Sequence, residues 1–495
     1  MKKVIYPALL SLLMLFACEE ELDINTDPNT PAQISKGLAL SAAQGSIATV
    51  IGGDLFNLGG MFAQYYTQSP GAGQYTQIDE YNLGTDYANR LWTELYAGAL
   101  NDLEFVKDES MEDEDPATFL IATVLQAYTF QYLVDVFGDV PYTEALVGNE
   151  NISPMPTPGE ETYADLIASI NEAMTAYEDS GGDSEVGAQD LIYNGEMENW
   201  VEFANTLLLR FYIRMASTSQ ANASAVMELI NRNNFLSENA AFSAFGDAIN
   251  KRNPFYEVQI DFLGNVNTIA SNSLLEFYLR NDDPRVNEVY TVNDEGIYVG
   301  LDQGEGLSPE FSAVQASDFS RPDIEPTHPV FFLTIPESEF LQAEALLRYA
   351  GGAGAEEKYI AGVASSFQLY SQIGDDQDLI GEVDPEEFTG DGQAYDYNGG
   401  ASFEENLEQI IVQKWAALAN INNIEAWIET KRTGYPVLTD PEDPLYEEGR
   451  RIISLASILP GDQIPFSLFY PELEVQRNTN IDQKNDLTEK VWWNQ

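Results

Sequence analysis

Carboxylates are the reactive groups that this sequence supplies in greatest number. The chain of 495 residues carries 81 Asp and Glu against 23 Lys and Arg, with one His and one Cys, so its formal net charge is −58. Two carboxylates about 5–10 Å apart can hydrolyse a glycosidic bond, one as the acid and the other as base or nucleophile. With so many carboxylates such a pair is expected by chance, and no local sequence marks one. A surface glycoside hydrolase therefore stays an open alternative.

One acidic segment has the spacing of a calcium-binding loop. Asp376, Asp378 and Glu387 occupy positions 1, 3 and 12 of an EF-hand-type pattern, with Gly381 at position 6. Ile380 stands at position 5, where a side-chain oxygen is required. We therefore expect no cofactor, and we keep Ca²⁺ at Asp376, Asp378 and Glu387 as the one metal candidate.

The single histidine and the single cysteine exclude several reaction classes. One cysteine forms no disulfide within the chain, a Cys/His zinc site needs more of these residues, and a Ser-His-Asp triad would depend on His328 alone. His328 lies between Pro326 and Pro329, which is typical of a loop, so we expect no catalytic role for it. The charge of −58 repels phosphate backbones, and we therefore expect no nucleic-acid partner.

Aromatic side chains in loops are the candidates for ligand binding. Flat rings pack against the apolar faces of sugar rings, while amide and carboxylate groups bond sugar hydroxyls. Three loops rich in Gly, Ser, Gln and Asp carry such rings, over residues 71–82, 308–322 and 392–400. The candidate rings are Tyr75, Tyr81, Phe311, Phe319, Tyr395 and Tyr397, and the candidate hydroxyl partners are Asp79, Asn82, Gln74, Gln77 and Gln315.

The six tryptophans are expected in the core instead. Trp200, Trp415 and Trp427 fall on helical stripes whose other members are mostly apolar. Trp92 heads a segment with Leu95, Leu100 and Leu103 in helical spacing, and Trp492 and Trp493 are expected to close the fold at the chain end.

The elements that carry these residues are predominantly helical. Apolar residues recur every three or four positions, which predicts amphipathic helices, and one longer segment is apolar nearly all round, which predicts a buried helix. The amphipathic segments are Tyr163–Tyr177, Trp200–Met215, Phe340–Leu347 and Leu407–Leu418, and the buried one is Phe119–Phe137. Alanines at the expected contacts favour tetratricopeptide-like helix hairpins, although no clean 34-residue repeat is present. We predict a mainly α fold with long loops.

Loops of unusual length separate these helices. The longest are Ser69–Tyr87, Gly148–Glu161, Asp179–Gly195, Asn281–Pro336 and Gly374–Ser402. Loops of this length inside a compact fold are usually functional. The predicted helices on both sides of each loop have the same amphipathic character, so none of the loops is interpreted as a linker between domains. We predict a single domain over residues 18–495. We interpret the acidic run Lys107–Pro116 as a solvated loop between helices.

The amino terminus has the pattern of a lipoprotein signal. Met1-Lys2-Lys3 is basic, and the apolar run Val4–Ala17 is too short to span a bilayer. It ends in Leu15-Phe16-Ala17-Cys18, which resembles a bacterial lipobox. We expect residues 1–17 to be removed and Cys18 to carry the lipid, with more than one acyl chain needed for a stable anchor. An ordinary signal peptide with an incidental cysteine stays the alternative.

Several motifs, taken in order, resemble one protein family. Glu19-Glu20-Glu21 is similar to the surface-export signal of Bacteroidota lipoproteins. The other motifs are Leu22–Asn29, Gln126–Tyr128, Phe137–Tyr142, Asn205 with Leu208-Leu209-Arg210 and Arg214, Asp283-Pro284-Arg285, Glu339–Ala345, Gln413-Lys414-Trp415, Glu425-Ala426-Trp427 and Lys431–Pro436. The ordered set resembles the SusD/RagB family of nutrient-binding outer-membrane lipoproteins in its SusD-like branch. One departure is Ile464–Pro471, which lacks the arginine that relatives often carry before Tyr-Pro.

The resemblance implies a function as well as a fold. Such proteins are implied to be helical, with tetratricopeptide-like helix pairs as a scaffold and loops as the ligand face. The ligand face is implied to use loops that correspond to residues 71–82 and 308–322. The proteins are implied to cover a SusC-like TonB-dependent barrel at the cell surface, to be held at the outer membrane by the lipid, and not to be enzymes. They are implied to capture oligosaccharides, and the alternative of a peptide-binding member stays open.

Charge narrows the expected ligand. Between Cys18 and Leu209 there are 34 acidic residues and three basic ones, Lys36, Arg90 and Lys107. An acidic surface is also common in proteins from salty water, where ions screen the repulsion. A like-charge pair at contact still costs about 1 kcal/mol in water. We therefore expect a neutral oligosaccharide instead of a sulfated or uronate-rich glycan.

Overall fold

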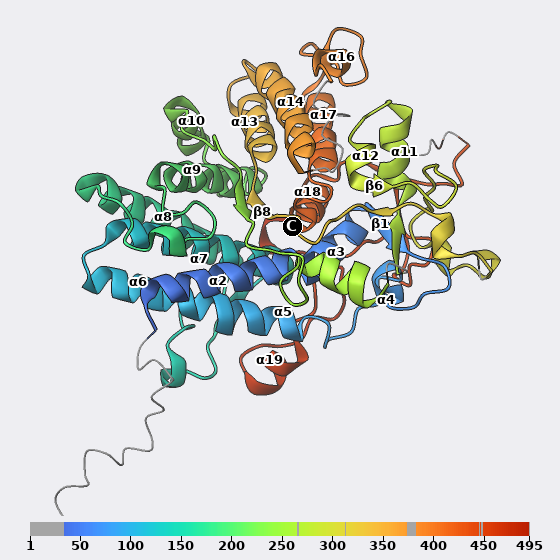
Figure 1. Cartoon of the computed structure of the whole chain (residues 1–495). Coiled ribbons are helices and arrows are strands. Elements are labelled where there is room, and N and C mark those ends of the chain that lie inside the picture. The colour runs from blue at the N-terminus through green and yellow to red at the C-terminus, as the bar shows by residue number, and fades with distance from the viewer. Residues whose placement is uncertain are drawn as a thin grey trace, which may run out of the picture.

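Helices joined by long loops make up most of the structure (Figure 1). The structure is a computed structural model, and it describes residues 34–264, 267–311, 313–373, 383–444, 446 and 449–494. The expected signal peptide, Cys18, Asp376 and Asp378 lie outside these residues. The prediction of a mainly α fold is confirmed.

The first half of the chain supplies most of the long helices. The helices up to residue 262 are α2 Lys36–Ile51, α3 Asp54–Phe62, α4 Thr76–Asp79, α5 Asn89–Thr93, the π-helix η1 Glu94–Leu100, α6 Asn101–Glu112, α7 Pro116–Phe137, α8 Gly159–Ser180, α9 Met197–Arg214, α10 Ala223–Arg232 and the π-helix η4 Tyr256–Phe262.

The second half adds helices in pairs. They are α11 Asn272–Arg280, α12 Val286–Val289, α13 Ile335–Tyr349, α14 Ala355–Ile373, α16 Glu386–Thr389, α17 Phe403–Ala417, α18 Asn423–Thr433 and α19 Glu472–Arg477. Short 3₁₀ turns are η2 Gly148–Glu150, η3 Gly187–Gln189, η5 Glu305–Leu307, η6 Pro309–Phe311, η7 Ala316–Asp318 and η8 Trp492–Asn494.

The strands in the described residues form small two-stranded sheets, which hold segments of the loops together by backbone hydrogen bonds. Four pairs are antiparallel and the last is parallel. The pairs are β1 Tyr66–Gln68 with β5 Thr268–Ala270, β2 Val140–Pro141 with β3 Pro156–Thr157, β4 Ala240–Phe242 with β8 Val330–Leu333, β6 Tyr290–Thr291 with β7 Arg321–Pro322, and β9 Leu438–Thr439 with β10 Arg451–Ile452.

Neighbouring helices pack against one another in succession. In Figure 1, α6, α7, α8 and α9 lie together on one side of the molecule, and α13, α14 and α17 lie together at the top. Gly362 of α14 permits a close approach to α13, because a Cβ atom there would lie 2.7 Å from the Phe340 ring. Gly59 of α3 does the same for α18, where a Cβ atom would lie 2.4 Å from the Asn423 backbone. The predicted helix-hairpin scaffold is confirmed.

Helix α7 is the buried helix that its sequence predicts. Asp115 caps its start by accepting a hydrogen bond from the Thr118 N–H at 3.0 Å, and Pro116 occupies the first turn. Among the described residues, α7 is the one helix long and apolar enough to cross a membrane. Its apolar side chains are enclosed by the protein itself, so they form the centre of the fold.

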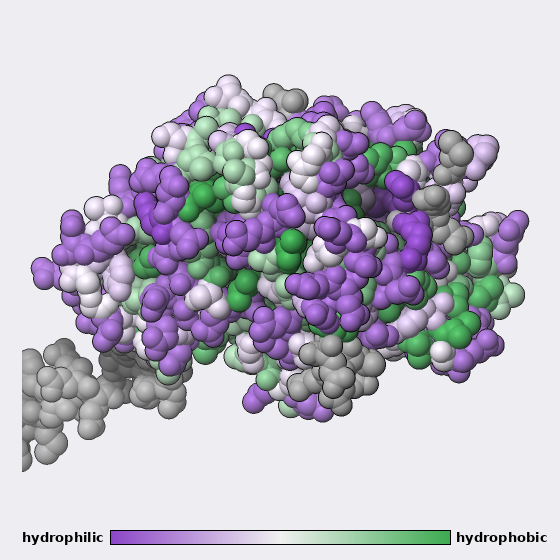
Figure 2. Space-filling view, turned by 90° about the horizontal axis from the view of Figure 1, so that it is seen from above, coloured by the Kyte–Doolittle hydropathy of each residue, from purple (hydrophilic) through white to green (hydrophobic). Residues whose placement is uncertain are grey.

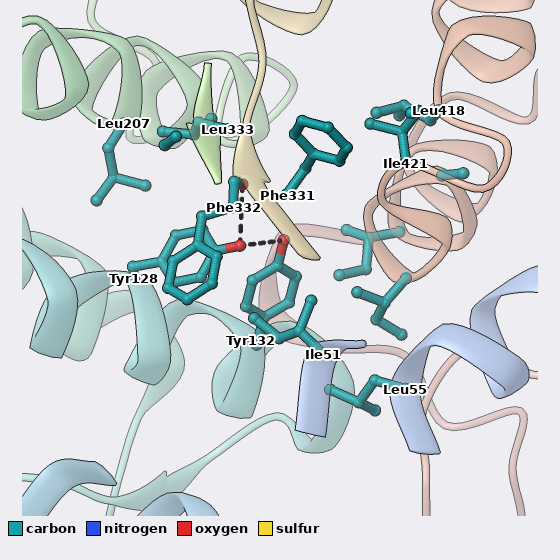
Figure 3. Packing of buried hydrophobic residues seen from close by; sticks show 14 of the residues in the cluster. Ile51, Leu55, Tyr128, Tyr132, Leu207, Phe331, Phe332, Leu333, Leu418 and Ile421 are labelled. Carbon is teal, nitrogen blue, oxygen red and sulfur yellow. Dashed lines mark hydrogen bonds between the residues drawn. The ribbon is translucent and has the colours of Figure 1, made fainter. Parts of the chain in front are cut away.

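The core around α7 includes aromatic rings with satisfied hydroxyls (Figure 3). The Tyr128 ring stacks on Phe332 of β8 at 5.2 Å between centroids, and its hydroxyl donates to the Phe332 carbonyl at 2.9 Å. The Tyr128 hydroxyl also lies 3.4 Å from that of Tyr132. Buried tyrosines require such partners.

Buried ion pairs connect the helices through the same core. Arg210 of α9 contacts Glu337 of α13 at 2.8 Å, and Arg214 contacts Glu425 of α18 at 2.6 Å. Lys414 of α17 contacts Glu429 at 3.1 Å. Arg210, Arg214, Lys414 and Glu425 belong to the motifs that carry the family resemblance, so these motifs contribute to the stability of the scaffold.

The acidic run Lys107–Pro116 was expected to be a loop, and that prediction is wrong. Helix α6 continues to Glu112, and residues 113–115 alone connect it to α7. Val106 and Ser110 are buried on the inner face of α6, while the acidic side chains lie on its outer face. Packing of this face therefore outweighs the repulsion between neighbouring carboxylates.

The tryptophans lie in the core, as predicted for the three on helical stripes. Trp200, Trp415 and Trp427 are at most 1% exposed. Trp92 and Trp493 are also buried, and Trp492 is partly buried against the core. No tryptophan is therefore offered to a ligand as an open platform.

Candidate ligand-binding site

A cavity of about 560 Å³ opens where α2 ends and α3 begins, and we call it cavity A. Its walls come from the start of α3, the loop before α4, the start of α5 and the segment 250–259. Helices α3, α4 and α5 are marked in Figure 1. A cavity of this size suits a short oligosaccharide or a ligand of similar bulk.

The break between α2 and α3 creates this cavity. Gly52 permits it, because a Cβ atom there would lie 2.2 Å from a Val330 methyl group. Gly53 then precedes α3 and provides no capping side chain. The first backbone N–H groups of a helix have no partner within the helix. The first turn of α3 therefore has no side-chain cap.

Two amide side chains at the wall of cavity A carry acceptors without a donor. Asn57 is 3% exposed and Gln259 is 6% exposed, and the Oδ1 of Asn57 and the Oε1 of Gln259 have no hydrogen-bond partner. The Gln259 Nε2 donates to the Tyr75 hydroxyl, which fixes the orientation of this amide. A buried acceptor left unsatisfied costs about 1–3 kcal/mol. A ligand that brings hydroxyl donors would remove this cost.

Two tyrosines give cavity A its aromatic lining. Tyr75 and Tyr87 are both partly exposed and both line the cavity. Burial raises the pKa of each phenol, and the neighbouring Asp54 carboxylate raises the pKa of each further. Both phenols are therefore neutral at pH 7 and able to donate or accept hydrogen bonds. Aromatic rings next to amides are the residue types that bind sugar rings.

The charged residues that line cavity A are balanced, with two of each sign. The Arg90 Nε lies 3.2 Å from the Asp54 Oδ2, although burial still raises the pKa of Asp54. Arg252 contacts Asp247 at 3.1 Å and Asp261 at 3.0 Å, both outside the lining. Figure 2 shows one face of the molecule, seen from above, on which hydrophilic side chains dominate. Cavity A is thus close to neutral on a chain of net charge −58.

The loop that contains the single histidine supports one wall of cavity A. Asn253 lies between the lining residues Arg252 and Pro254, and its N–H donates to the Pro326 carbonyl at 2.7 Å. Its Nδ2 donates to the His328 carbonyl at 2.9 Å. The His328 Nε2 lies 2.9 Å from the Asn420 carbonyl, which makes it the donor. His328 therefore has a structural role, and nothing around it suggests catalysis.

We expect His328 to titrate near pH 4. Burial lowers its pKa from 6.5 to about 4. Between these values the unfolded chain binds a proton that the folded chain does not, so the stability that depends on neutral His328 is lost as the pH falls through this range. Since the chain has one histidine, the imidazole proton resonances in a ¹H NMR titration are assigned without mutants. A midpoint near 6.5 would contradict the burial of this ring.

The first predicted loop contributes one of its two rings to cavity A. Tyr75 and Gln74 line the cavity, and Asn82 is exposed. Asp79 is fully buried and accepts from the Thr67 hydroxyl at 2.8 Å and the Gln68 N–H at 2.7 Å, while burial raises its pKa to about 6. Asp79 therefore fixes the conformation of the loop. Because it is buried, the prediction that it contacts a ligand is withdrawn.

Tyr81 from the same loop is also a core residue. It is 3% exposed, and its ring packs edge-on against Phe62 at 5.8 Å. Its hydroxyl accepts from the Ser454 N–H at 3.4 Å. The prediction that this ring forms a platform is corrected, because no face of it is open. The other two candidates for bonding sugar hydroxyls, Gln77 and Gln315, are exposed and do not line cavity A.

The second and third loops fold onto the protein as well. Phe319 is buried with Ile269 and Leu301 in a small apolar cluster, and Phe311 packs against it, partly buried. Tyr395 and Tyr397 are buried, and the Tyr395 hydroxyl donates to Asp283 at 2.5 Å. A buried ring has no open face for a sugar. The prediction that Phe319, Tyr395 and Tyr397 stack on a ligand is therefore withdrawn.

The remaining residues of cavity A were not found from the sequence. Asn57, Tyr87 and Gln259 come from three segments that no local motif joins. Two signals were available: the Gly52-Gly53 break between helices, and the basic pair Lys251-Arg252 in an acidic chain.

The calcium candidate is not tested by the structure. Glu387 lies in α16, whereas Asp376, Asp378 and Gly381 lie outside the described residues. Within the described residues, no three His, Cys, Asp or Glu side chains are grouped so as to hold a metal ion.

Known proteins similar to this chain point to one family. The SusD-like family model, described as starch-binding and associating with the outer membrane, matches residues 28–454. A SusD homolog from Bacteroides uniformis ATCC 8492 has a TM-score of 0.73 at 26% identity, over 92% of this chain and 99% of the other. Among curated proteins, none matches the chain.

Two further solved structures share the fold. A chitin-binding protein has a TM-score of 0.70 at 24% identity, over 93% of this chain and 100% of the other. A chitin-binding SusD homolog from Flavobacterium johnsoniae has a TM-score of 0.73 at 20% identity, over 93% and 99%.

Proposed function

Because the chain belongs to the SusD-like family of starch-binding proteins that associate with the outer membrane, we propose that it captures a neutral oligosaccharide in cavity A at the cell surface. The family consists of binding proteins, so the chain is not an enzyme, and the alternative of a glycoside hydrolase is wrong. The captured glycan would pass to a SusC-like TonB-dependent barrel, with the protein held by a lipid on Cys18.

The unsatisfied amide oxygens of Asn57 and Gln259 are the observation that carries this proposal. Each needs a donor, and each sugar hydroxyl supplies one while it can accept a bond from a donor such as the Tyr87 hydroxyl. Tyr75 and Tyr87 supply rings beside these groups. A neutral polyhydroxylated ring meets all three requirements.

Charge supports a neutral ligand. The charged lining of cavity A sums to zero, while the chain around it is strongly acidic. A uronate or sulfate would find Arg90 already beside Asp54 and Arg252 already beside two carboxylates. Chitin, which two relatives are described as binding, is a neutral polymer and belongs among the first ligands to test.

We expect Tyr75→Ala to weaken glycan binding several-fold without unfolding the protein. Stacking on an aromatic ring contributes about 1 kcal/mol beyond the area that is buried, and the loss of the Tyr75 hydroxyl also frees the Gln259 amide to rotate. Calorimetric titration with neutral hexasaccharides measures the change, and a thermal melt checks the fold.

Tyr177→Ala is the matched control for this variant. Tyr177 is another partly exposed tyrosine, near the end of α8, and it does not line cavity A. Equal affinities for Tyr75→Ala, Tyr177→Ala and the wild type would place the ligand elsewhere.

A further inference from the structure

A second cavity of about 470 Å³ lies between α11, α14 and α17, and we call it cavity B. It shares no lining residue with cavity A. In Figure 1, α11 and α17 stand in the upper half of the molecule and α5 in the lower half, so the two cavities lie on different parts of the scaffold. The third predicted loop, residues 392–400, forms one wall of cavity B.

The wall that this loop forms is held in place by hydrogen bonds. The Tyr359 hydroxyl of α14 donates to the Tyr395 carbonyl at 3.0 Å. The Gln409 Nε2 of α17 donates to the Asp396 carbonyl. Tyr395 itself is anchored in the core through Asp283. Cavity B is therefore formed before any ligand arrives, which lowers the entropic cost of binding.

The start of α17 places an unsatisfied acceptor at cavity B. Ser402 and Glu405 form a capping box that fixes the first turn of this helix. Asn406 follows on that turn, lines the cavity and is 5% exposed, and its Oδ1 has no hydrogen-bond partner. Cavity B therefore has an unsatisfied amide oxygen on one of its lining residues, as cavity A does.

The other lining groups of cavity B define what it can bind. Asp396, Glu405 and Glu408 outnumber Arg280, so the lining has a formal charge of −2 and disfavours phosphate and carboxylate ligands. Acceptors are in excess, so a ligand must bring donors. Phe277 is the partly exposed ring of this cavity and stacks on Tyr395 at 6.0 Å. Amides, carboxylates and one ring are again the groups that bind sugar hydroxyls and sugar faces.

We propose that cavity B is a second glycan-binding site, which holds another sugar unit of the neutral polymer bound in cavity A. The identity of the ligand rests on the proposed function, whereas the existence of the site rests on cavity B alone. Two linked contacts with one chain raise its avidity without changing either site. The protein would then retain a long glycan better than a short one.

Two variants remove cavity B in different ways. Ala394→Trp fills it from an exposed position of the loop, and Ala223→Trp at the exposed start of α10 is its control. Asn406→Leu replaces the unsatisfied oxygen by a methyl group and keeps the number of side-chain heavy atoms. Replacing an unpaired buried polar group by an apolar one is neutral or stabilising, so a structural role alone predicts unchanged binding.

The test is calorimetric titration with chitohexaose, cellohexaose, maltohexaose and laminarihexaose, with a thermal melt of each variant. We expect two sites per chain in the wild type and in Ala223→Trp, and one site in Ala394→Trp and in Asn406→Leu. If the wild type has one site, and this site is lost in Asn57→Leu but kept in both cavity B variants, the inference is overturned and cavity A stands as the glycan site. If the single site is instead lost in the cavity B variants and kept in Asn57→Leu, cavity B is supported as a glycan site, and the proposal that cavity A binds the glycan is overturned. Binding of none of the four sugars would overturn both.

Discussion

Arg214→Met is expected to destabilise the protein by about 3–5 kcal/mol, because it leaves buried carboxylates without their counter-charge. Arg214 is almost fully buried, and its guanidinium lies 3.2 Å from Asp135 and 2.6 Å from Glu425, with Glu429 also in contact. Methionine replaces the volume of the side chain but none of its positive charge. Chemical unfolding monitored by circular dichroism measures the loss.

A partly exposed ion pair provides the control for Arg214. Arg232 lies 3.5 Å from Glu228 on α10, where solvent screens the pair. Glu228→Gln removes this pair from its exposed side and is therefore expected to cost about 1 kcal/mol or less. If both substitutions cost the same, the buried pairs do not stabilise the scaffold as proposed.

Cys18→Ala is expected to abolish retention of the protein at the outer membrane. A single lipid attachment site, Cys18, is predicted from the basic start, the apolar run and Ala17-Cys18. The chain has no other cysteine. Loss of that site removes the anchor as a whole, so the expected effect is complete and not graded. Fractionation of cells with mass spectrometry of the amino-terminal peptide measures it.

The control for Cys18→Ala is a substitution beside the proposed lipid site. Glu21→Ala keeps the cysteine and is expected to leave the acyl mass unchanged, although it shortens the acidic stretch behind it. Membrane retention of Cys18→Ala, together with an unmodified amino-terminal peptide in the wild type, would contradict the lipid anchor.

The helical scaffold was predictable from the sequence because its signals are local. The apolar spacing of residues 163–177 and 200–215 predicts α8 and α9, and both are present. The acidic run 107–116 misled this reasoning, since its composition is that of a loop and its burial depends on α7. Periodicity decides the type of an element, whereas its length depends on what packs against it.

The candidate site was only partly predictable because it depends on contacts between distant segments. Tyr75, a predicted ligand-binding ring, lines cavity A, whereas Tyr81, six residues later, belongs to the core. Asp79 bonds Gln303, 224 residues away, and such a contact leaves no local pattern. Loop composition shows where a ligand face can form, and the fold decides which loop residues turn inward.

The family motifs illustrate the same division between scaffold and site. Arg210, Arg214 and Lys414 stand in the motifs, and all three form buried ion pairs. Cavity A uses none of the residues quoted in those motifs. A motif shared across a family can thus identify the scaffold without locating the ligand.

The measurement that tests the account most directly is a paired titration and melt of Asn57→Leu. Asn57 Oδ1 is buried at the wall of cavity A without a donor, so leucine removes a cost in the free protein and a partner for the ligand. We predict a melting temperature at or above that of the wild type and an affinity for the best neutral hexasaccharide that is about tenfold lower, as one lost hydrogen bond of about 1.4 kcal/mol implies. Wild-type affinity in a variant that melts at or above the wild-type temperature would contradict cavity A as the glycan site.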